Sequence, residues 1–296
     1  MNFVIWPNLS KNNAKDTALA VCRLLAAHHA ENTRIFMAEK YTEAFSHMEG
    51  ITFLPRQCLM EQADFAVAIG GDGTILRCAE ALQGTGTKLV GINTGRLGFI
   101  AACESSETEL LHRLFTGQYT ISHRMMLQTE LPHTDHENRI YHALNDVYAT
   151  RCGGRLCDFA VFVDEQLIGT YRADGIILST PTGSTAYALS AGGPVMEPDL
   201  ALIEMNLICP HSLFARPMLF APQRKLRVTY RVKESGGLNV YVDGRNKITL
   251  QEGQSFTVTR SDHTIPFVDF KGYGFYDALN GKLMQPLKDA PGFLKE

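Results

Sequence analysis

The sequence predicts a protein of the class α/β plus all-β, with an amino-terminal α/β domain and a carboxyl-terminal domain of packed β-sheets. Two observations predict this division. Up to about residue 118, apolar strand-like runs alternate with apolar residues at helical spacing, which is typical of a parallel sheet with helices on its faces. From about residue 120, strand-like segments follow one another with turn residues between them, which favours two packed sheets.

The predicted domains are residues 1–118 and 119–271, and residues 272–296 are expected to return to the first domain as a helix. In the α/β part we predict strands at 3–6, 34–37, 65–69 and 89–92, and helices beginning near residues 18, 75 and 108. In the β part we predict strands at 139–151, 159–163, 167–179, 202–209, 225–232, 238–242 and 255–259, and a short helix over 182–191. Asp243 and Gly244 separate two of these strands and predict a hairpin turn, because glycine tolerates positive φ.

The composition of the chain argues against a nucleic-acid-binding, a secreted or a membrane-spanning protein. The chain has 296 residues, 45% of them hydrophobic, a net charge of −3 and no long basic run, so we expect no nucleic-acid partner. The amino end lacks the pattern of a secretory signal, and no stretch reaches the roughly 18 apolar residues that span a membrane. The seven cysteines are dispersed and form no C-x-x-C pair, which is typical of reduced cysteines in a cytoplasmic protein.

A glycine-rich turn, Gly70-Gly71-Asp72-Gly73-Thr74, follows a strand that is apolar throughout and opens a helix. Such a turn lets backbone N–H groups approach and hold phosphate oxygens at the carboxyl end of a strand. A carboxylate repels phosphates unless it binds a metal ion or accepts a proton, so Asp72 is either a general base or part of a magnesium site. The alternative is a tight turn in which Asp72 only caps the helix. The residues match neither G-x-G-x-x-G nor the Walker pattern.

The segment 174–194 reads DGIILSTPTGSTAYALSAGGP, an apolar strand that passes into a hydroxyl-rich turn. Pro181 fixes one φ angle and Gly183 permits the next bend. The turn supplies neutral hydroxyl groups from Thr180, Thr182, Ser184, Thr185 and Ser190, and Tyr187 offers a flat face to a base. This set suits a purine and its ribose, whereas a nucleophile elbow of the G-x-S-x-G type is absent from the sequence. The alternative is a Ser/Thr-rich loop with a capped helix.

Asn145 and Asp146 are polar residues in a predicted strand. Asparagine can pair with an adenine edge, and a carboxylate suits ribose hydroxyls. The alternative is a strand end with solvated polar side chains.

These three motifs together resemble the NAD kinase family, in their residues, order and approximate spacing. Residues 91–99 and 209–217 carry further likeness, so the resemblance covers roughly residues 65–270, whereas the first fifty residues carry little. The glycine-rich turn alone is shared with diacylglycerol kinases, sphingosine kinases and phosphofructokinases. The segment 174–194 is specific to the NAD kinases.

The resemblance implies a Rossmann-like α/β domain and a β-sandwich domain, with NAD bound between them. It implies transfer of a phosphoryl group from ATP to the 2′-hydroxyl of the adenosine ribose of NAD, with a divalent cation such as Mg²⁺. Polyphosphate is a further donor in the family, and homodimers or homotetramers are its usual assemblies.

The resemblance also assigns site residues. Asp72 is implied as the catalytic base near the 2′-hydroxyl, Asn145 and Thr185 as adenine contacts, Tyr187 as a neighbour of the base, and Asp146 as a ribose contact. Other positions of the implied NAD site are Gly73, Arg77, Arg155, Arg172, Asp174, Thr182, Ala186, Ser190 and Arg245. The ATP phosphates are expected at Gly70, Gly71, Gly73 and Thr74. Asp146 replaces the commoner glutamate, and Arg245 stands where many members have glutamine.

Two other functions compete with this interpretation. A lipid kinase could use the same Gly-Asp-Gly turn, but it would need an apolar substrate entrance, which the sequence does not indicate. A non-catalytic NAD-sensing module could keep the binding residues without the chemistry, and the presence of Asp72 argues against it.

Overall fold

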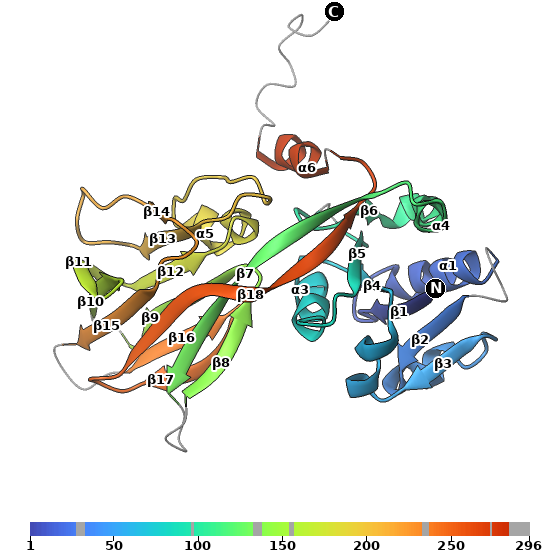
Figure 1. Ribbon diagram of the computed structural model, residues 1–296, viewed down its shortest axis with the longest axis horizontal. Helices are drawn as coiled ribbons and strands as arrows, with labels where there is room; N and C mark the ends of the chain where they lie inside the picture. The colour runs from blue at the N-terminus through green and yellow to red at the C-terminus, as the bar shows by residue number, and fades with distance from the viewer. Residues whose placement is uncertain are drawn as a thin grey trace, which may run out of the picture. The chain divides into compact units, whose positions relative to one another are not determined.

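A computed structural model describes residues 1–27, 33–95, 98–132, 138–153, 157–232, 237–272 and 274–283. The chain divides into two compact units (Figure 1). Unit 1 comprises Met1–Ser122 and Pro266–Glu296, and unit 2 comprises His123–Ile265. None of the helices in the described ranges is long and apolar enough to cross a membrane.

Unit 1 is an α/β domain. Its strands are β1 (Asn2–Pro7), β2 (Arg34–Ala38), β3 (Ile51–Leu54), β4 (Phe65–Gly70), β5 (Lys88–Asn93) and β6 (Cys103–Glu104). Its α-helices are α1 (Ala14–Ala27), α2 (Thr42–Phe45), α3 (Asp72–Ala81), α4 (Arg113–Thr116) and α6 (Gly274–Leu283). Its 3₁₀ helices are η1 (Glu39–Tyr41), η2 (Arg56–Cys58), η3 (Met60–Gln62) and η4 (Ser105–His112). The predicted α/β class is therefore confirmed.

The strand order in the sheet of unit 1 reverses between β1 and β4, because β2 and β3 lie on one side of β1, and β4 and β5 lie on the other. Its parallel strands lie in the order β3-β2-β1-β4-β5. The chain moves from β1 to β2 in one direction and from β4 to β5 in the other, so right-handed crossovers place α1 and α3 on opposite faces. Both faces are thus covered, and every residue of β4 is buried. Ligands in sheets of this kind bind at the carboxyl ends of the strands where the order reverses.

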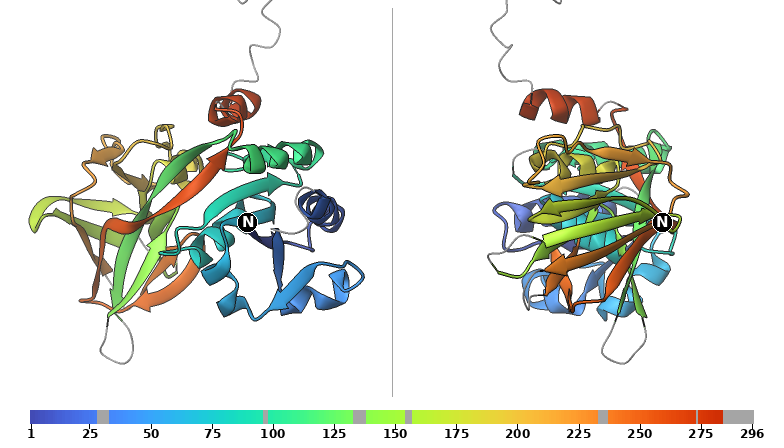
Figure 2. Two further views of the ribbon diagram at one scale, coloured as in Figure 1. Left: turned by 45° about the vertical axis from the view of Figure 1, so that its right-hand side comes forward. Right: turned by 90° about the vertical axis from the view of Figure 1, so that its left-hand side faces the viewer.

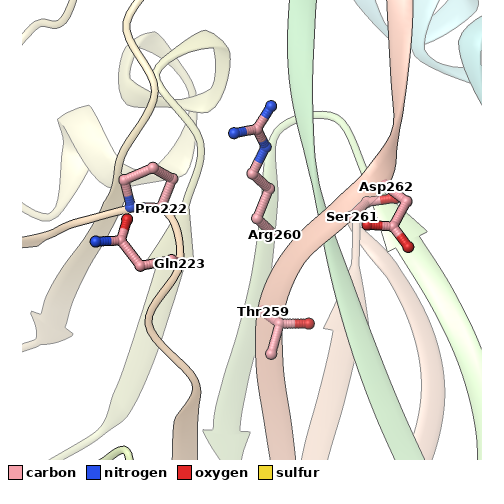
Figure 3. A pocket seen from close by; sticks show the side chains of 6 residues that line it. All are labelled: Pro222, Gln223, Thr259, Arg260, Ser261 and Asp262. Atoms are coloured by element: carbon pink, nitrogen blue, oxygen red, sulfur yellow. The ribbon is translucent and has the colours of Figure 1, made fainter.

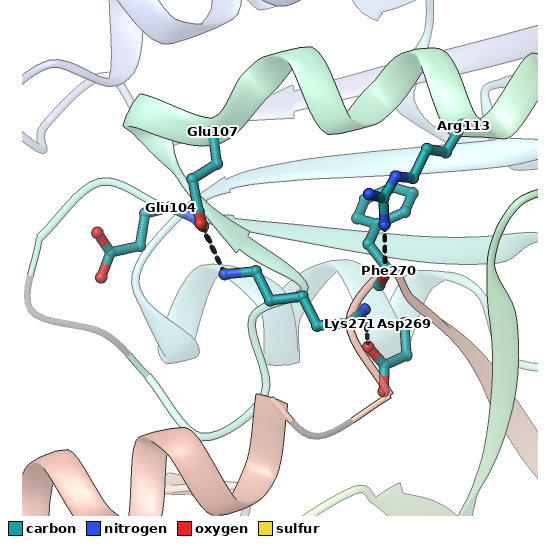
Figure 4. Close-up of polar contacts among 6 residues, drawn as sticks. All are labelled: Glu104, Glu107, Arg113, Asp269, Phe270 and Lys271. Carbon is teal, nitrogen blue, oxygen red and sulfur yellow. Dashed lines mark hydrogen bonds and ion pairs between the residues drawn. The ribbon is translucent and has the colours of Figure 1, made fainter.

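The carboxyl-terminal part of unit 1 is fastened by charged side chains (Figure 4). The Nζ of Lys271 lies 2.7 Å from Oε1 of Glu107, and Nη1 of Arg113 donates a hydrogen bond of 2.7 Å to the carbonyl of Phe270. Asp269 accepts hydrogen bonds from the backbone N–H groups of residues 271 and 272. These contacts hold residues 269–272 against η4 and α4, immediately before α6 begins.

Unit 2 consists of two antiparallel sheets with short helical turns. Its strands are β7 (Thr120–Pro132), β8 (Asn138–Ala143), β9 (Asp146–Arg151), β10 (Cys157–Val163), β11 (Gln166–Ala173), β12 (Gly175–Ser179), β13 (Ile203–Ile208), β14 (Met218–Phe220), β15 (Leu226–Val232), β16 (Leu238–Val242), β17 (Arg245–Leu250) and β18 (Ser255–Asp269). Its helical turns are η5 (Thr182–Thr185) and α5 (Tyr187–Ser190). The ends of β7 and β18 extend into unit 1.

One sheet of unit 2 has the order β14-β13-β12-β9-β16-β17, and the other contains β11, β10, β15 and β18 together with β7 and β8. The long strands β7 and β18 lie side by side in both views (Figure 2). Apolar side chains from both sheets form one buried core, which includes Val147, Phe159 and Phe256. On β9 and β12 the alternate positions face away from this core, and Asp146 is paired there with Ser179.

Four predicted segments have different bounds in the structure. The predicted strand 139–151 is divided into β8 and β9, because backbone N–H groups of residues 144–146 bond to the side chain of Asp243. The predicted strand 167–179 is divided at Asp174, where the chain passes from one sheet to the other. The strand predicted at 255–259 is only the start of β18, and the helix predicted at 182–191 is the two short turns η5 and α5.

Candidate active site

The glycine-rich turn lies at the carboxyl end of β4 and forms the first turn of α3. Gly70 has φ +158°, and a Cβ atom there would lie 2.4 Å from Oγ1 of Thr74. That hydroxyl accepts a hydrogen bond of 3.1 Å from Nδ2 of Asn8, which follows β1. The Thr74 N–H donates to the carbonyl of Gly71. The first amides of a helix are the backbone groups that most often bind an anion.

The carboxylate of Asp72 is held by the backbone of residues 98 and 99, which follow β5. Its Oδ2 accepts a hydrogen bond of 3.2 Å from the N–H of Phe99, and a Cβ atom at Gly98 would lie only 1.7 Å from its Oδ1. Backbone therefore fits directly against this carboxylate, which restricts its rotamers. Asp72 is consequently held in a fixed position at the glycine-rich turn.

A pocket of about 530 Å³ opens beside this turn in unit 1. Its lining includes Gly71, which follows β4, together with Asn93, which ends β5, and Thr94, which follows it. Ser10 and Lys11 from the loop after β1 form its other side. The pocket therefore lies where the strand order reverses, which is the expected place for a ligand in this architecture.

Asn145 and Asp146 are held by a carboxylate that the sequence did not single out as a ligand of the backbone. Asp243 accepts hydrogen bonds from the N–H groups of Leu144, Asn145 and Asp146, at 2.9, 2.8 and 3.2 Å. Asp243 has φ +46° and Gly244 has φ +74°, the angles of a tight hairpin turn between β16 and β17. The predicted hairpin turn is confirmed, and its aspartate also fixes the Asn145-Asp146 pair.

Asp146 is 3% exposed. Removal from water, and then the nearby charge of Asp243, raise the pKa of the Asp146 carboxyl to about 8. Removal from water also raises the pKa of Asp243, and this effect outweighs the three amide hydrogen bonds that the carboxylate accepts, which lower that pKa. At neutral pH this pair therefore carries less negative charge than two ordinary aspartates.

The hydroxyl-rich turn packs against the same pair. The carbonyl of Asn145 accepts hydrogen bonds from the N–H of Thr180 and the hydroxyl of Ser179, and a Cβ atom at Gly183 would lie 2.1 Å from that oxygen. Ser184 donates its hydroxyl to the carbonyl of Pro181. The turn is therefore rigid, and it begins immediately beside Asn145.

Two predicted site residues in this region have a buried polar atom without a hydrogen-bond partner in the described part of the chain. They are the acceptor Oδ1 of Asn145 and the hydroxyl Oγ1 of Thr182, which can donate or accept. Buried polar atoms are nearly always paired in folded proteins, so these atoms are suited to the donor groups of a ligand. Tyr187 is 37% exposed, and its ring meets that of Tyr148 edge-on, with centroids 5.0 Å apart. It therefore offers an exposed, fixed aromatic surface near these atoms.

The remaining predicted site residues differ in their hydrogen-bond and ion-pair partners. Arg172 binds both oxygens of Asp158, at 2.7 and 3.0 Å, and Nε of Arg151 lies 2.8 Å from Oδ1 of Asp174. Thr185 bonds to the carbonyl of Thr182, the N–H of Ala186 bonds to Gly183, and Ser190 is exposed at the end of α5. Arg245 begins β17 and its charge acts on Asp243. Arg77 lies in unit 1, and Arg155 lies outside the described residues.

A buried polar pair beneath residue 193 was not predicted. Glu204 is fully buried, and its Oε1 accepts a hydrogen bond of 2.6 Å from Nδ2 of Asn206. A Cβ atom at Gly193 would lie 2.0 Å from that oxygen, so the Gly-Gly end of the hydroxyl-rich segment rests directly on the pair. Removal from water raises the pKa of Glu204. The alternation of polar and apolar residues in 203–207 was the only sequence signal for this pair.

A pocket of unit 2, of about 380 Å³, is lined by residues 222–223 and 259–262 and contains none of the predicted site residues (Figure 3). Within the described ranges, no group of three or more His, Cys, Asp or Glu side chains is placed to hold a metal ion. Mg²⁺ in phosphoryl transfer is usually bound through one or two carboxylates and the substrate phosphates. The carboxylate of Asp72 at the glycine-rich turn fits that mode of binding.

Comparison with known proteins decides between the kinase families that share the turn. The model of the ATP-NAD kinase N-terminal domain matches residues 3–119, and that of the ATP-NAD kinase C-terminal domain matches residues 144–270. The chain belongs to the NAD kinase family. The predicted kinase activity is therefore confirmed at the level of the family, and the lipid kinase alternative gains no support.

Individual relatives agree with this assignment. The chain is 32% identical over 286 residues to an NAD kinase of Thermoanaerobacter sp. (strain X514), covering 95% of this chain and 98% of the relative. It is 36% identical over 241 residues to an NAD kinase of Thiobacillus denitrificans, covering 79% and 82%.

Two solved structures share the fold. A crystal structure of yeast NADH kinase complexed with NADH has a TM-score of 0.88 at 24% identity, covering all of this chain and 90% of that chain. The structure of an NAD kinase from Archaeoglobus fulgidus in complex with ATP has a TM-score of 0.69 at 26% identity, covering 93% and 96%. The predicted combination of an α/β domain and an antiparallel β domain is thus confirmed.

The burial of Asp146 makes stability depend on pH. The unfolded carboxyl loses its proton near pH 4, whereas the folded one keeps it to about pH 8. Between these values the folded state binds more protons, so its free energy of unfolding falls as pH rises. We expect Asp146→Asn to gain stability relative to the wild type between pH 5 and 8, measured by urea unfolding. The exposed Asp262→Asn is the control, and an unchanged difference between wild type and D146N across this range would contradict the assignment.

Gly183 should tolerate no side chain, because a Cβ atom there meets backbone rather than a movable side chain. We expect Gly183→Ala to lower the free energy of unfolding by about 3 kcal/mol. Gly253→Ala is the control, since only its φ of +85° opposes a side chain, at about 1 kcal/mol. Denaturant unfolding measures both, and equal losses would show that the turn adapts.

Proposed function

We propose that this protein transfers the γ-phosphoryl group of ATP to the 2′-hydroxyl of the adenosine ribose of NAD, giving NADP and ADP. The observation that carries the proposal is the fixed carboxylate of Asp72 at a glycine-rich turn, with the N–H of Phe99 on one oxygen. Together with family membership, this supports a phosphotransferase with an alcohol acceptor rather than a passive NAD-sensing module.

In the proposed step, the ribose oxygen forms a bond to the γ-phosphorus while the bond from that phosphorus to the β–γ bridging oxygen breaks. The hydroxyl proton passes to the carboxylate of Asp72, and ADP leaves. The transition state is loose, so positioning and charge stabilisation contribute most of the acceleration. The early amides of α3 would bind phosphate oxygens. A bound Mg²⁺ would neutralise developing charge on the phosphates, with Asp72 as the nearby carboxylate.

The adenosine half of NAD is assigned to unit 2. Oδ1 of Asn145 and Oγ1 of Thr182 are the buried acceptors that would pair with its donor groups. The ribose hydroxyls would bond to Asp146, whose raised pKa lets it donate as well as accept. Thr185 and Tyr187 would contact the adenine, and the remaining predicted residues of the turn would line the same site.

The expected location, assembly and phosphoryl donors of the enzyme follow from its resemblance to the NAD kinases. We expect a cytoplasmic enzyme that forms homodimers or homotetramers and acts on NAD and ATP, with polyphosphate as a further donor to be tested. A direct assay combines purified protein, NAD, ATP and magnesium, and detects NADP with an NADP-specific dehydrogenase. Absence of NADP, or turnover only with a lipid acceptor such as diacylglycerol, would overturn the proposal.

Replacement of the proposed base should act on turnover. We expect Asp72→Asn to lower kcat by about 10²–10⁴-fold, because general-base assistance is lost. The KM for NAD should change by no more than about two-fold, because the other residues assigned to NAD binding remain. Steady-state kinetics with both substrates measures this, and unchanged kcat would remove Asp72 from its role.

The position of the carboxylate can be tested without removing it. In Gly98→Ala the new Cβ would overlap Oδ1 of Asp72, so the carboxylate must move. We expect kcat to fall by about 10²-fold, since a displacement near 1 Å has an effect of this size. Gly274→Ala, where a Cβ meets nothing within 4 Å, is the control. Equal kcat values in the two variants would show that the contact with Gly98 does not position Asp72.

A further inference from the structure

A second pocket of unit 1, of about 240 Å³, gathers three cationic side chains, those of Lys40, Arg56 and Arg77. None of the described residues that line it is acidic. Like charges repel one another, and this repulsion opposes placing three cations around a single small pocket. A bound anion would reverse that effect, so the composition of the pocket points to an anionic ligand.

The three cations come from different strands but share one edge of the sheet. Lys40 lies in η1 directly after β2, Arg56 begins η2 directly after β3, and Arg77 lies on α3 after β4. Since these strands are parallel, their carboxyl ends meet at the same edge. Trp6 and Asn8, at the end of β1 and just after it, complete the pocket beside the point where the strand order reverses.

Aromatic rings hold two of the cations in place. The guanidinium of Arg56 lies 4.9 Å from the ring centre of Trp6, and Nζ of Lys40 lies 4.7 Å from that of Tyr41. Both rings are buried, and the hydroxyl of Tyr41 donates a hydrogen bond to the carbonyl of Pro7. The cations are therefore partly ordered before a ligand binds, which lowers the entropy lost on binding.

The pocket adjoins the phosphate-binding turn. Thr74, the last residue of that turn, lines the pocket, and Arg77 lies three residues further along α3, on the same side of the helix. The hydrogen bond from Asn8 to Thr74 connects the loop after β1 to this turn. An anion held at the start of α3 would thus be within the field of the cations of this pocket.

We infer that Lys40, Arg56 and Arg77 bind the phosphate chain of the phosphoryl donor, whether that chain belongs to ATP or to inorganic polyphosphate. The inference rests on the proposed function for the identity of the donor. It places Arg77 on the donor side of the reaction, whereas the family resemblance had suggested the NAD side. Lys40 and Arg56 lie in or near the first fifty residues, where that resemblance offered no guidance.

The test compares Lys40→Gln, Arg56→Gln, Arg77→Gln and the double variant K40Q/R56Q with the wild type. All three side chains are exposed, so the fold should persist, and Arg56→Lys retains the charge. Steady-state kinetics should show the KM for ATP raised about 10-fold for each lost cation, with kcat and the KM for NAD within about two-fold. Arg23→Gln, an exposed cation on α1 outside this pocket, should change none of these values.

Calorimetric titration of the full chain without NAD separates the sources of the phosphate chain. We expect ATP and inorganic tripolyphosphate both to bind about 10-fold more weakly to each single variant, and Arg56→Lys to recover most of the loss. Weaker binding of ATP with unchanged tripolyphosphate would overturn the inference, because the side chains would then recognise the nucleoside. A raised KM for NAD alone, or no change in any variant, would also overturn it.

The same measurements distinguish this inference from the proposed function. If the wild type forms no NADP while the variants lose tripolyphosphate affinity, the proposed function fails and the anion site stands. If the wild type forms NADP and the variants match it in every measurement, the inference fails alone.

Discussion

The carboxylate of Asp243 accepts hydrogen bonds from three consecutive backbone amides, and the arrangement of the Asn145-Asp146 pair and the turn beside it depends on this contact. It ends β8, starts β9 and turns the carbonyl of Asn145 toward residues 179 and 180. The turn around Gly183 then packs on that carbonyl with no room for a Cβ atom. One half-buried acid in a hairpin turn thus sets the positions of the Asn145-Asp146 pair and of the hydroxyl-rich turn.

Unit 1 uses close backbone approach for a related purpose. Gly70 leaves space for Thr74, and Gly98 leaves space for the carboxylate of Asp72. Side chains at these positions would displace the hydroxyl of Thr74 and the carboxylate of Asp72, the groups of the proposed phosphate binding and proton transfer. The reversal of strand order between β1 and β4 brings these groups to one edge of the sheet, next to the cationic pocket. The strand order therefore places these groups at one edge of the sheet, and the glycines at 70 and 98 leave the space that the groups occupy.

Much of this could be predicted from the sequence, for physical reasons. The strand β4 is apolar at every position because helices cover both faces of its sheet, and Asp243-Gly244 predicts its turn because both residues tolerate positive φ. Contacts between distant residues were not predictable. Nothing local to Asp243 indicates that its side chain binds residues 144–146, so the break between β8 and β9 was missed. Lys40 and Arg56 belong to no motif, and only the parallel sheet brings them together.

The contact between Gly193 and Glu204 has a consequence for how this protein can vary. The carboxyl oxygen of Glu204 occupies the volume that a methyl group at position 193 would need. The two positions are therefore not independent. Because Nδ2 of Asn206 would also lie 2.6 Å from that methyl group, a chain gains room at 193 only where the side chains at both 204 and 206 are smaller. Among related sequences, the residue types at these two positions should change in concert, with glycine retained at 193 wherever a long acidic side chain lies beneath it.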